Sequence, residues 1–241
     1  KPATYYRDMF VLEDCESNNE YILAIKCDYG LAIFHNGTAY GLLPSQGRIG
    51  ATRKFIDSYL MKDGSRYTDQ AGWESKEFAE QIADRDPRLA QSFRTPGYTR
   101  IDGTDILAPD LSSCCTGYQT IKWVMSCKAN GGDSDRVDRS TSDLPVYRYA
   151  EILLIYAEAM AELGKDDQTV LNNTINLLRK RVGMPSLTVD VTADPYLTNP
   201  DYGYTNPKLL ANSNLALILE IRRERAIELA QEANNRWYDL V

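Results

Sequence analysis

The last hundred residues carry the pattern that most restricts the fold of this chain. Residues 147–163 are apolar on nearly every side, which is typical of a helix that is buried all round. Gly164-Lys165 then turns the chain, and Asp166 or Asp167 can cap a second helix. This second helix has apolar residues spaced 4, 3 and 4 apart: Leu171, Ile175, Leu178 and Val182. Because two helices joined by so short a turn pack antiparallel, the sequence predicts a helical hairpin of tetratricopeptide type.

Charged side chains interrupt the apolar faces of the two long helices. On the first, Glu151, Glu158 and Glu162 form one narrow stripe, since offsets of 7 and 11 residues return to nearly the same side of a helix. On the final helix, Arg222 projects into an apolar face and Arg225 lies on the adjoining stripe. A charge in an apolar face is costly unless it is paired. We therefore predict a structural charge network in which Arg222 or Arg225 meets the glutamate stripe, and prefer it to an acid–base pair.

The other segments are predicted to be short elements separated by loops. Strands are expected at residues 20–27 and 119–127, short helices at 52–61 and 74–84, a polar loop at 128–145, and a final helix from Ser213 or Asn214 to about residue 231. The predicted fold is mainly α, with tetratricopeptide-like helical hairpins, long loops and a few short β-strands. Residues 1–146 are expected to form a loop-rich binding part, and residues 147–241 a helical part.

Composition limits the class of partner. The 241 residues are 43 % hydrophobic and 25 % charged, which is ordinary for a globular protein. The net charge of −7 and the absence of a basic stripe argue against a nucleic-acid partner.

No apolar run is long enough to span a membrane, and the abrupt start and end suggest a fragment of a larger protein. The five cysteines fit neither a zinc pattern nor a disulfide framework, so free thiols are expected, although a bridge from Cys27 stays open.

The sequence contains no familiar catalytic motif. It has no G-x-S-x-G, no H-E-x-x-H and no glycine-rich phosphate loop, and its single histidine, His35, lies in a turn-like His-Asn-Gly. An acidic stretch at residues 130–138 resembles the start of a calcium loop, but Val137 and Asp138 break the required pattern. We expect neither a cofactor nor a metal, and no catalytic residues.

Five segments, taken in order, resemble landmarks of the SusD/RagB family. Residues 146–159, VYRYAEILLIYAEA, are similar to its R-x-A-E-x-L-L-x-Y-A-E-A helix, and residues 178–185, LRKRVGMP, to the turn that follows. Residues 221–240 resemble its E-R-x-x-E-L-x-x-E-x-x-R-W-x-D-L pattern, apart from Ala233-Asn234-Asn235. Upstream, FIDSYLMKDG at 55–64 and RDPRL at 85–89 complete the resemblance.

This resemblance implies a role in nutrient uptake. It implies a helical surface protein, lipid-anchored to the outer membrane of a Bacteroidetes-type bacterium through an upstream cysteine outside this chain. It also implies a partner, a SusC-type TonB-dependent transporter over which the protein sits as a lid. The family's upstream half is absent from this sequence. The expected function is therefore capture of a nutrient, most simply a glycan or oligosaccharide, for that transporter.

Aromatic residues in loops are the candidate ligand contacts. A sugar ring needs an exposed aromatic platform together with planar polar side chains. We single out Trp73, Tyr98, Tyr202 and Tyr204 as candidate ligand-binding residues, whereas Trp123 and Trp237 are interpreted as structural. Two other functions stay open, namely a carboxylate-dependent glycoside hydrolase and a tetratricopeptide-type scaffold that binds peptides.

Overall fold

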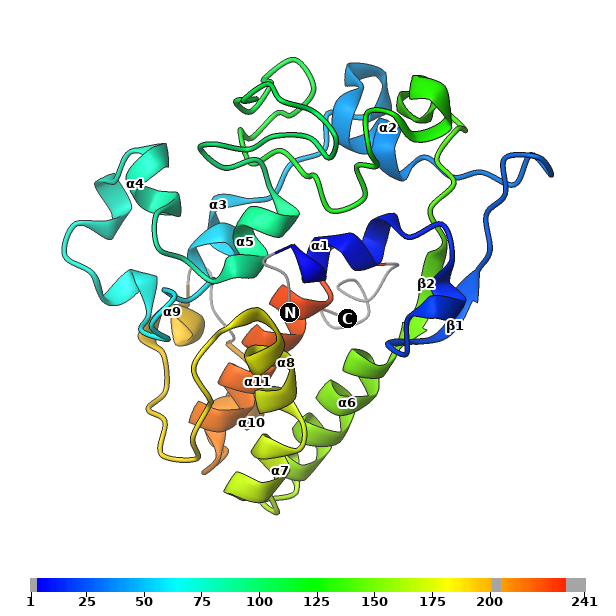
Figure 1. Ribbon diagram of the computed structural model, residues 1–241. Helices are drawn as coiled ribbons and strands as arrows, with labels where there is room; N and C mark the ends of the chain where they lie inside the picture. Colours follow the sequence, from blue (N-terminus) through cyan, green and yellow to red (C-terminus); the bar gives the residue numbers. More distant parts are fainter. Residues whose placement is uncertain (1–3, 201–204, 233–241) are drawn as a thin grey trace.

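Helices carry most of the secondary structure in the computed structural model, which describes residues 4–200 and 205–232 (Figure 1). The two longest are α6 (Tyr149–Glu162) and α11 (Leu215–Glu228). The shorter ones are α1 (Tyr5–Asp8), α2 (Gly37–Leu42), α3 (Arg53–Asp57), α4 (Phe78–Ile82), α5 (Pro87–Ser92), α7 (Gln168–Asn172), α8 (Ile175–Val182), α9 (Pro195–Thr198) and α10 (Pro207–Leu210). The mainly helical fold predicted from the sequence is confirmed.

The predicted hairpin is present, but its second helix is broken in two. Asp167 caps it by accepting a hydrogen bond from the backbone N–H of Val170 at 2.8 Å. The break between α7 and α8 falls at Thr174, whose hydroxyl donates to the carbonyl oxygen of Val170 and so competes with the regular helical pattern. Gly183 ends α8 in the left-handed conformation, at φ 78°, which glycine adopts without strain. Figure 1 shows α6, α7, α8 and α11 together in the lower half of the molecule.

A single two-stranded sheet joins the two halves of the described chain. β1 (Tyr21–Ile25) pairs antiparallel with β2 (Leu144–Arg148), which leads directly into α6. The strand predicted at 20–27 is therefore found, whereas β2 occupies residues that the sequence assigned to a loop and a helix start. The sequence did not predict β2 because the strand contains Pro145, and proline is depleted in strands and tolerated mainly at a sheet edge.

The strand predicted at residues 119–127 is wrong. Ile121, Lys122 and Val124 are all buried, so the segment lacks the half-exposed alternation of a surface strand. It makes only isolated bridges to separate segments, such as the one between Gln119 and Gly50. The helices expected at 52–61 and 74–84 are also shorter than predicted, because α3 ends at Asp57 and α4 covers only Phe78–Ile82.

The most buried charges form one cluster around the end of α11. Arg88 Nη1 lies 2.6 Å from Glu224 Oε1 and 3.1 Å from Glu228 Oε2. Arg148 Nη2 lies 3.1 Å from Glu228 Oε1, and its Nε lies 2.6 Å from Glu232 Oε2. Arg179 and Arg181 of α8 complete the cluster by contacting Glu224 and Glu228 respectively. Because these arginines come from α5, β2 and α8, the cluster ties three separate segments of the chain to α11.

The charge network predicted from the helical spacing differs from this buried cluster. Arg222 contacts Glu158 at 2.8 Å and Glu162 at 3.0 Å, and Arg225 lies 3.8 Å from Glu151. The Arg222 side chain is 29 % exposed, however, so its pairs lie at the rim of the helical part and not in its interior. The predicted pairing of Arg222 and Arg225 with the glutamate stripe is therefore found, whereas the expected burial of the Arg222 pairs is corrected.

We predict that replacing Glu228 with glutamine strongly destabilises the fold. The substitution removes the one carboxylate that contacts three buried guanidinium groups, and breaking a buried ion pair costs about 3–5 kcal/mol of unfolding free energy. The matched control is Glu158→Gln, where the partly exposed pair with Arg222 contributes about 0–1 kcal/mol. Urea denaturation of both variants measures the difference, and equal losses would contradict a dominant role for the Glu228 cluster.

The same cluster predicts loss of stability in acid. Burial raises the pKa of Glu228, but the guanidinium groups of Arg181, Arg148 and Arg88 outweigh burial and hold that pKa well below its usual range. The pKa of the unfolded side chain is about 4.3, so the stabilisation is present above this pH and is lost as the pH falls below it. Glu228→Gln should therefore flatten the dependence of unfolding free energy on pH by about 1.4 kcal/mol per pH unit below pH ~4. An unchanged slope would show that other groups control acid unfolding.

Candidate functional site

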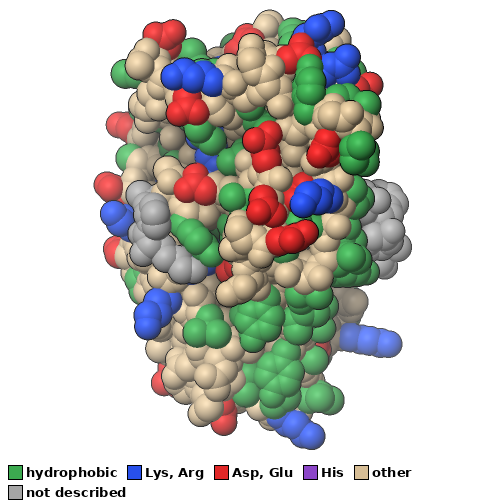
Figure 2. Space-filling model, turned by 45° about the vertical axis from the view of Figure 1, so that its right-hand side comes forward, with side chains coloured by type: hydrophobic (Ala, Val, Ile, Leu, Met, Phe, Trp, Pro, Cys, Tyr) green, Lys and Arg blue, Asp and Glu red, His purple; other side chains and the backbone are tan. Residues whose placement is uncertain are grey.

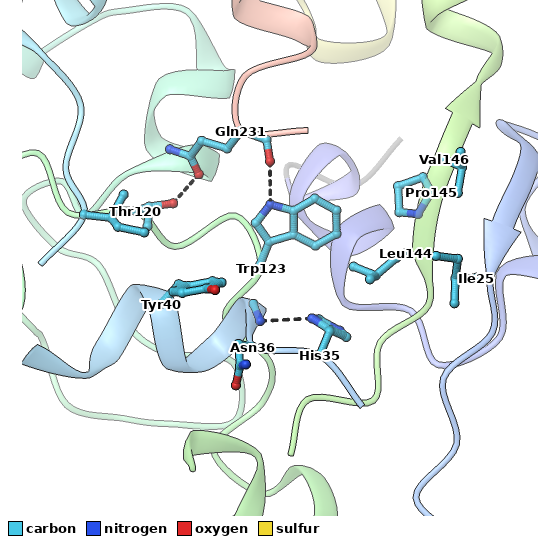
Figure 3. Close-up of a pocket in the computed structure, with 12 residues that line it drawn as sticks. Ile25, His35, Asn36, Tyr40, Thr120, Trp123, Leu144, Pro145, Val146 and Gln231 are labelled. Carbon is cyan, nitrogen blue, oxygen red and sulfur yellow. Dashed lines mark hydrogen bonds between the residues drawn. The ribbon is translucent and has the colours of Figure 1, made fainter. Parts of the chain in front are cut away.

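A pocket of about 410 Å³ opens between α2 and the β1–β2 sheet (Figure 3). Its walls are mainly apolar, with polar groups at a few positions. The lining residues are Ile25, His35, Asn36, Gly37, Tyr40, Ile49, Thr120, Trp123, Leu144, Pro145, Val146 and Gln231. Its volume and lining are typical of a small-molecule site.

Trp123 stands at the centre of this pocket, with Tyr40 on one side and Leu144 on the other (Figure 3). Its indole N–H donates to the backbone carbonyl of Gln231 at 3.0 Å, and its ring meets the edge of Phe10 at a centroid distance of 5.1 Å. The indole is partly buried and fixed in orientation, and it still lines the open pocket. The sequence interpretation of Trp123 as a core residue is therefore incomplete.

A glycine allows α2 to approach this indole. A Cβ atom on Gly37 would lie 2.9 Å from the Cβ of Trp123 and 2.8 Å from the ring of His35. Contacts this short would push the start of α2 away, so glycine is required for the observed wall of the pocket.

The fully buried Lys122 fixes the pocket floor to the end of α11. Its ammonium group donates to the carbonyl oxygen of Ala230 at 2.7 Å and to Glu232 at 2.6 Å. Burial lowers the pKa of Lys122 to about 8, with Glu232 opposing the shift. Because Lys122 and Trp123 both bond to residues 230–232, the pocket depends on the position of α11.

Tyr40 is the most accessible aromatic group of the pocket. It projects from α2, is 44 % exposed, and its hydroxyl makes no hydrogen bond within residues 4–200 and 205–232. An aromatic ring with one open face and a free hydroxyl can stack on an apolar surface while its hydroxyl bonds to a polar ligand. Sequence reasoning missed Tyr40 because it lies in a glycine-rich segment without a distinctive pattern.

The polar groups around the pocket are held by neighbouring loops. Asn36 donates to the Asp138 carboxylate at 2.7 Å, and the Thr120 hydroxyl contacts the Gln231 amide oxygen. His35, which the sequence places in a turn-like segment, is partly buried and bonds through Nε2 to the carbonyl oxygen of Ser142 at 2.8 Å. Burial lowers the pKa of His35 below its usual value. The pocket is therefore lined by neutral groups near pH 7.

Among the described residues that line this pocket, none is an aspartate or a glutamate. A paired-carboxylate mechanism for glycoside hydrolysis has no counterpart in it. Within residues 4–200 and 205–232 there is also no group of three metal-ligating side chains, and the five cysteines are free thiols. Among the helices of this part of the chain, none combines the length and apolarity needed to cross a bilayer. The pocket can bind a neutral ligand with an apolar face.

A second pocket, of about 510 Å³, lies beside α4. The rings of Phe78 and Tyr118 line it, with centroids 6.0 Å apart. Its planar polar groups are already engaged, because Gln81 bonds to both Asp57 and Tyr118, each at 2.7 Å. This pocket therefore offers fewer free polar groups than its mixed composition suggests.

Two of the predicted ligand-binding residues, Trp73 and Tyr98, pack against other side chains in the structure. Trp73 is partly buried, and its ring meets the edges of Tyr67 and Tyr196 at 6.0 and 5.6 Å. Tyr98 is 7 % exposed and packs in a cluster with Ile121 and Val124. These two residues lie outside the Tyr40–Trp123 pocket, and their contacts are those of packing residues.

The other two candidates, Tyr202 and Tyr204, lie outside the described residues, as does Trp237.

Comparison with known proteins gives one family match and several related folds. The SusD family profile matches residues 44–241. A SusD-like protein of Bacteroides fragilis is 23 % identical, with a TM-score of 0.63 over 99 % of this chain and 46 % of that one. A SusD-like carbohydrate binding protein of the same species is 22 % identical, with a TM-score of 0.59 over 98 % of this chain and 47 % of that one.

A SusD superfamily protein of Parabacteroides distasonis is 20 % identical, with a TM-score of 0.55 over 97 % of this chain and 41 % of that one. The chain thus spans less than half the length of each of these three structures. Among curated proteins, the comparison found no match. The family match covers most of the sequence, and the related folds agree with it. This chain belongs to the SusD family.

Proposed function

We propose that this chain captures a glycan in the pocket between Tyr40 and Trp123. The observation that carries the proposal is that two aromatic rings from separate segments line one open, neutral pocket with polar groups at its rim. A sugar ring has an apolar C–H face that stacks on aromatic rings and a rim of hydroxyls that needs polar partners. One relative of the same fold is a carbohydrate binding protein, which supports this class of ligand.

Capture without catalysis fits this pocket better than the two alternatives. A glycoside hydrolase of the usual kind needs two carboxyl groups on either side of the scissile bond, and the lining residues that the structure describes include none. A peptide-binding scaffold would use an extended groove along the helical hairpins, whereas this pocket lies between α2 and the sheet. The proposal therefore assigns the chain a binding role.

The wider role rests on membership of the SusD family. We propose that the complete protein is anchored by a lipid to the outer membrane, faces the cell exterior, and passes its ligand to a SusC-type TonB-dependent transporter. The sequence charge of −7 fits a soluble surface and a neutral ligand. Copurification of the complete protein with a SusC-type transporter of the same organism, expressed together with it, would test the partnership.

We predict that Tyr40→Ala abolishes glycan retention in affinity electrophoresis while leaving the melting temperature nearly unchanged. The ring is 44 % exposed and its hydroxyl bonds to none of the described residues, so its removal costs little packing. Tyr118→Ala in the second pocket is the matched control and should retain the glycan as the parent does. Reducing-end release, measured in parallel, distinguishes binding from hydrolysis. If only Tyr118→Ala loses retention, the glycan binds in the second pocket and not in the first. If reducing ends are released, the chain hydrolyses the glycan and the binding role is wrong.

We predict the opposite outcome for Trp73→Ala. Its ring packs between Tyr67 and Tyr196 against the main helical core, so truncation should lower the unfolding free energy by about 2 kcal/mol. Glycan retention of the folded variant should not change. Thermal denaturation and affinity electrophoresis of the same preparation measure both effects. Weaker glycan retention with an unaltered melting temperature would show instead that Trp73 contacts the glycan.

A further inference from the structure

One wall of the Tyr40–Trp123 pocket consists of hydrocarbon side chains. They come from β1 and β2, and Figure 3 shows them on the side of Trp123 that lies away from Tyr40. We call this surface the sheet wall, and its residues are Ile25, Leu144, Pro145 and Val146. Ile25 pairs with Leu144 across the sheet and is 52 % exposed. Pro145 has no backbone N–H, so the wall offers a ligand no donor at that position.

The polar side chains of the pocket are engaged within the protein. Thr120 donates to the amide oxygen of Gln231. Asn36 donates to the Asp138 carboxylate at 2.7 Å and accepts from the backbone N–H of the same residue. His35 bonds through its two ring nitrogens to backbone groups, at 2.8 and 3.0 Å. A ligand hydroxyl placed against the sheet wall therefore lacks a ready partner, and a buried hydroxyl without a partner weakens binding.

Tyr40 can serve the hydroxyls of a ligand from the opposite side. Its ring is 44 % exposed, and its hydroxyl bonds to none of the described residues. A phenolic hydroxyl both donates and accepts, so it suits a sugar hydroxyl. The pocket therefore has one side suited to hydroxyl groups and one side suited to hydrocarbon.

The surroundings of the pocket favour an uncharged sugar. Among the described residues that line it, none is a lysine, an arginine, an aspartate or a glutamate. Figure 2, which brings the side of the sheet forward, shows acidic and basic side chains interspersed in the upper half of the molecule. Mixed charges of this kind do not produce a field of one sign that would attract an ionic ligand.

We propose that the Tyr40–Trp123 pocket selects a 6-deoxyhexose residue of a neutral glycan and places its methyl group against the sheet wall. This inference rests on the proposed capture of a glycan and names the class of sugar. A hexose carries a hydroxymethyl group on C5, whereas a 6-deoxyhexose carries a methyl group there. The methyl group buries only hydrocarbon against the wall, whereas the hydroxymethyl group buries a hydroxyl without a partner.

An acetamido sugar fits the sheet wall less well, although its acetyl group also ends in a methyl. The amide brings an N–H donor and a carbonyl acceptor, and each of these groups needs a partner when it is buried. The side chains of Ile25, Leu144, Pro145 and Val146 supply neither a donor nor an acceptor. The methyl group of a 6-deoxyhexose makes no such demand.

The test measures the affinity of the complete gene product for matched sugars by saturation-transfer NMR. L-Fucose and L-galactose differ only in the methyl or hydroxymethyl group on C5, and L-rhamnose and L-mannose form a second such pair. We expect at least one 6-deoxy sugar to bind about tenfold tighter than its parent hexose, because an apolar pocket rejects an added hydroxyl by up to about a hundredfold. Its methyl protons should receive the strongest saturation.

Three outcomes would overturn the inference. The first is equal or tighter binding of both parent hexoses, and the second is tighter binding of N-acetylglucosamine than of either 6-deoxy sugar. The third is that none of these sugars binds. In each case, a glycan retained in affinity electrophoresis would leave the proposed capture of glycans standing, so the two proposals fail separately.

A matched pair of valine-to-threonine substitutions locates the preference. Val146→Thr places a hydroxyl in the sheet wall at nearly constant volume, and Val137→Thr makes the same change at a loop position that is 43 % exposed and does not line the pocket. We expect only Val146→Thr to reduce the preference for the 6-deoxy sugar, by several-fold. An unchanged preference would overturn the inference. If Val146→Thr does not fold, the saturation pattern of the parent protein decides, and strongest saturation of the ring protons would overturn the inference.

Discussion

Glu228 is fully buried near the end of α11, and three guanidinium groups from separate elements surround its carboxylate. Arg88 belongs to α5, Arg148 to β2 and Arg181 to α8. Desolvating these ions is costly, and their mutual attraction repays the cost only when the geometry satisfies every group. This requirement restricts how α5, β2 and α8 can pack against α11. Apolar packing then supplies most of the stabilisation, through the core shared by α6, α8 and α11.

The same arrangement positions the candidate binding site. Arg148 ends β2, whose preceding residues form one wall of the pocket. Lys122 and Trp123 bond to the segment that follows α11, and so the floor of the pocket moves with that helix. Tyr40 approaches from α2 and faces this fixed indole across the pocket. A ligand would therefore meet a preformed surface, which reduces the entropy lost on binding.

Local patterns were predictable from the sequence, and long-range contacts were not. The hairpin followed from the spacing of Leu171, Ile175 and Leu178, which depends only on helical geometry. The buried charge cluster could not be predicted from the sequence, because Arg88 and Glu228 are 140 residues apart and carry no shared motif. Charged side chains usually lie at the protein surface, but several charged side chains of α11 are buried in ion pairs. Tyr40 was missed and Trp123 was interpreted only as structural, since folding alone brings their segments together.

Hydrogen–deuterium exchange of Glu228→Gln, compared with Glu158→Gln, tests most directly whether one carboxylate holds α5, β2 and α8 against α11. Backbone amides of α5, β2 and α8 should exchange faster together in Glu228→Gln, because each element loses the same partner. In Glu158→Gln, exchange in these elements should match the parent protein. Faster exchange confined to the last turn of α11 would contradict the account.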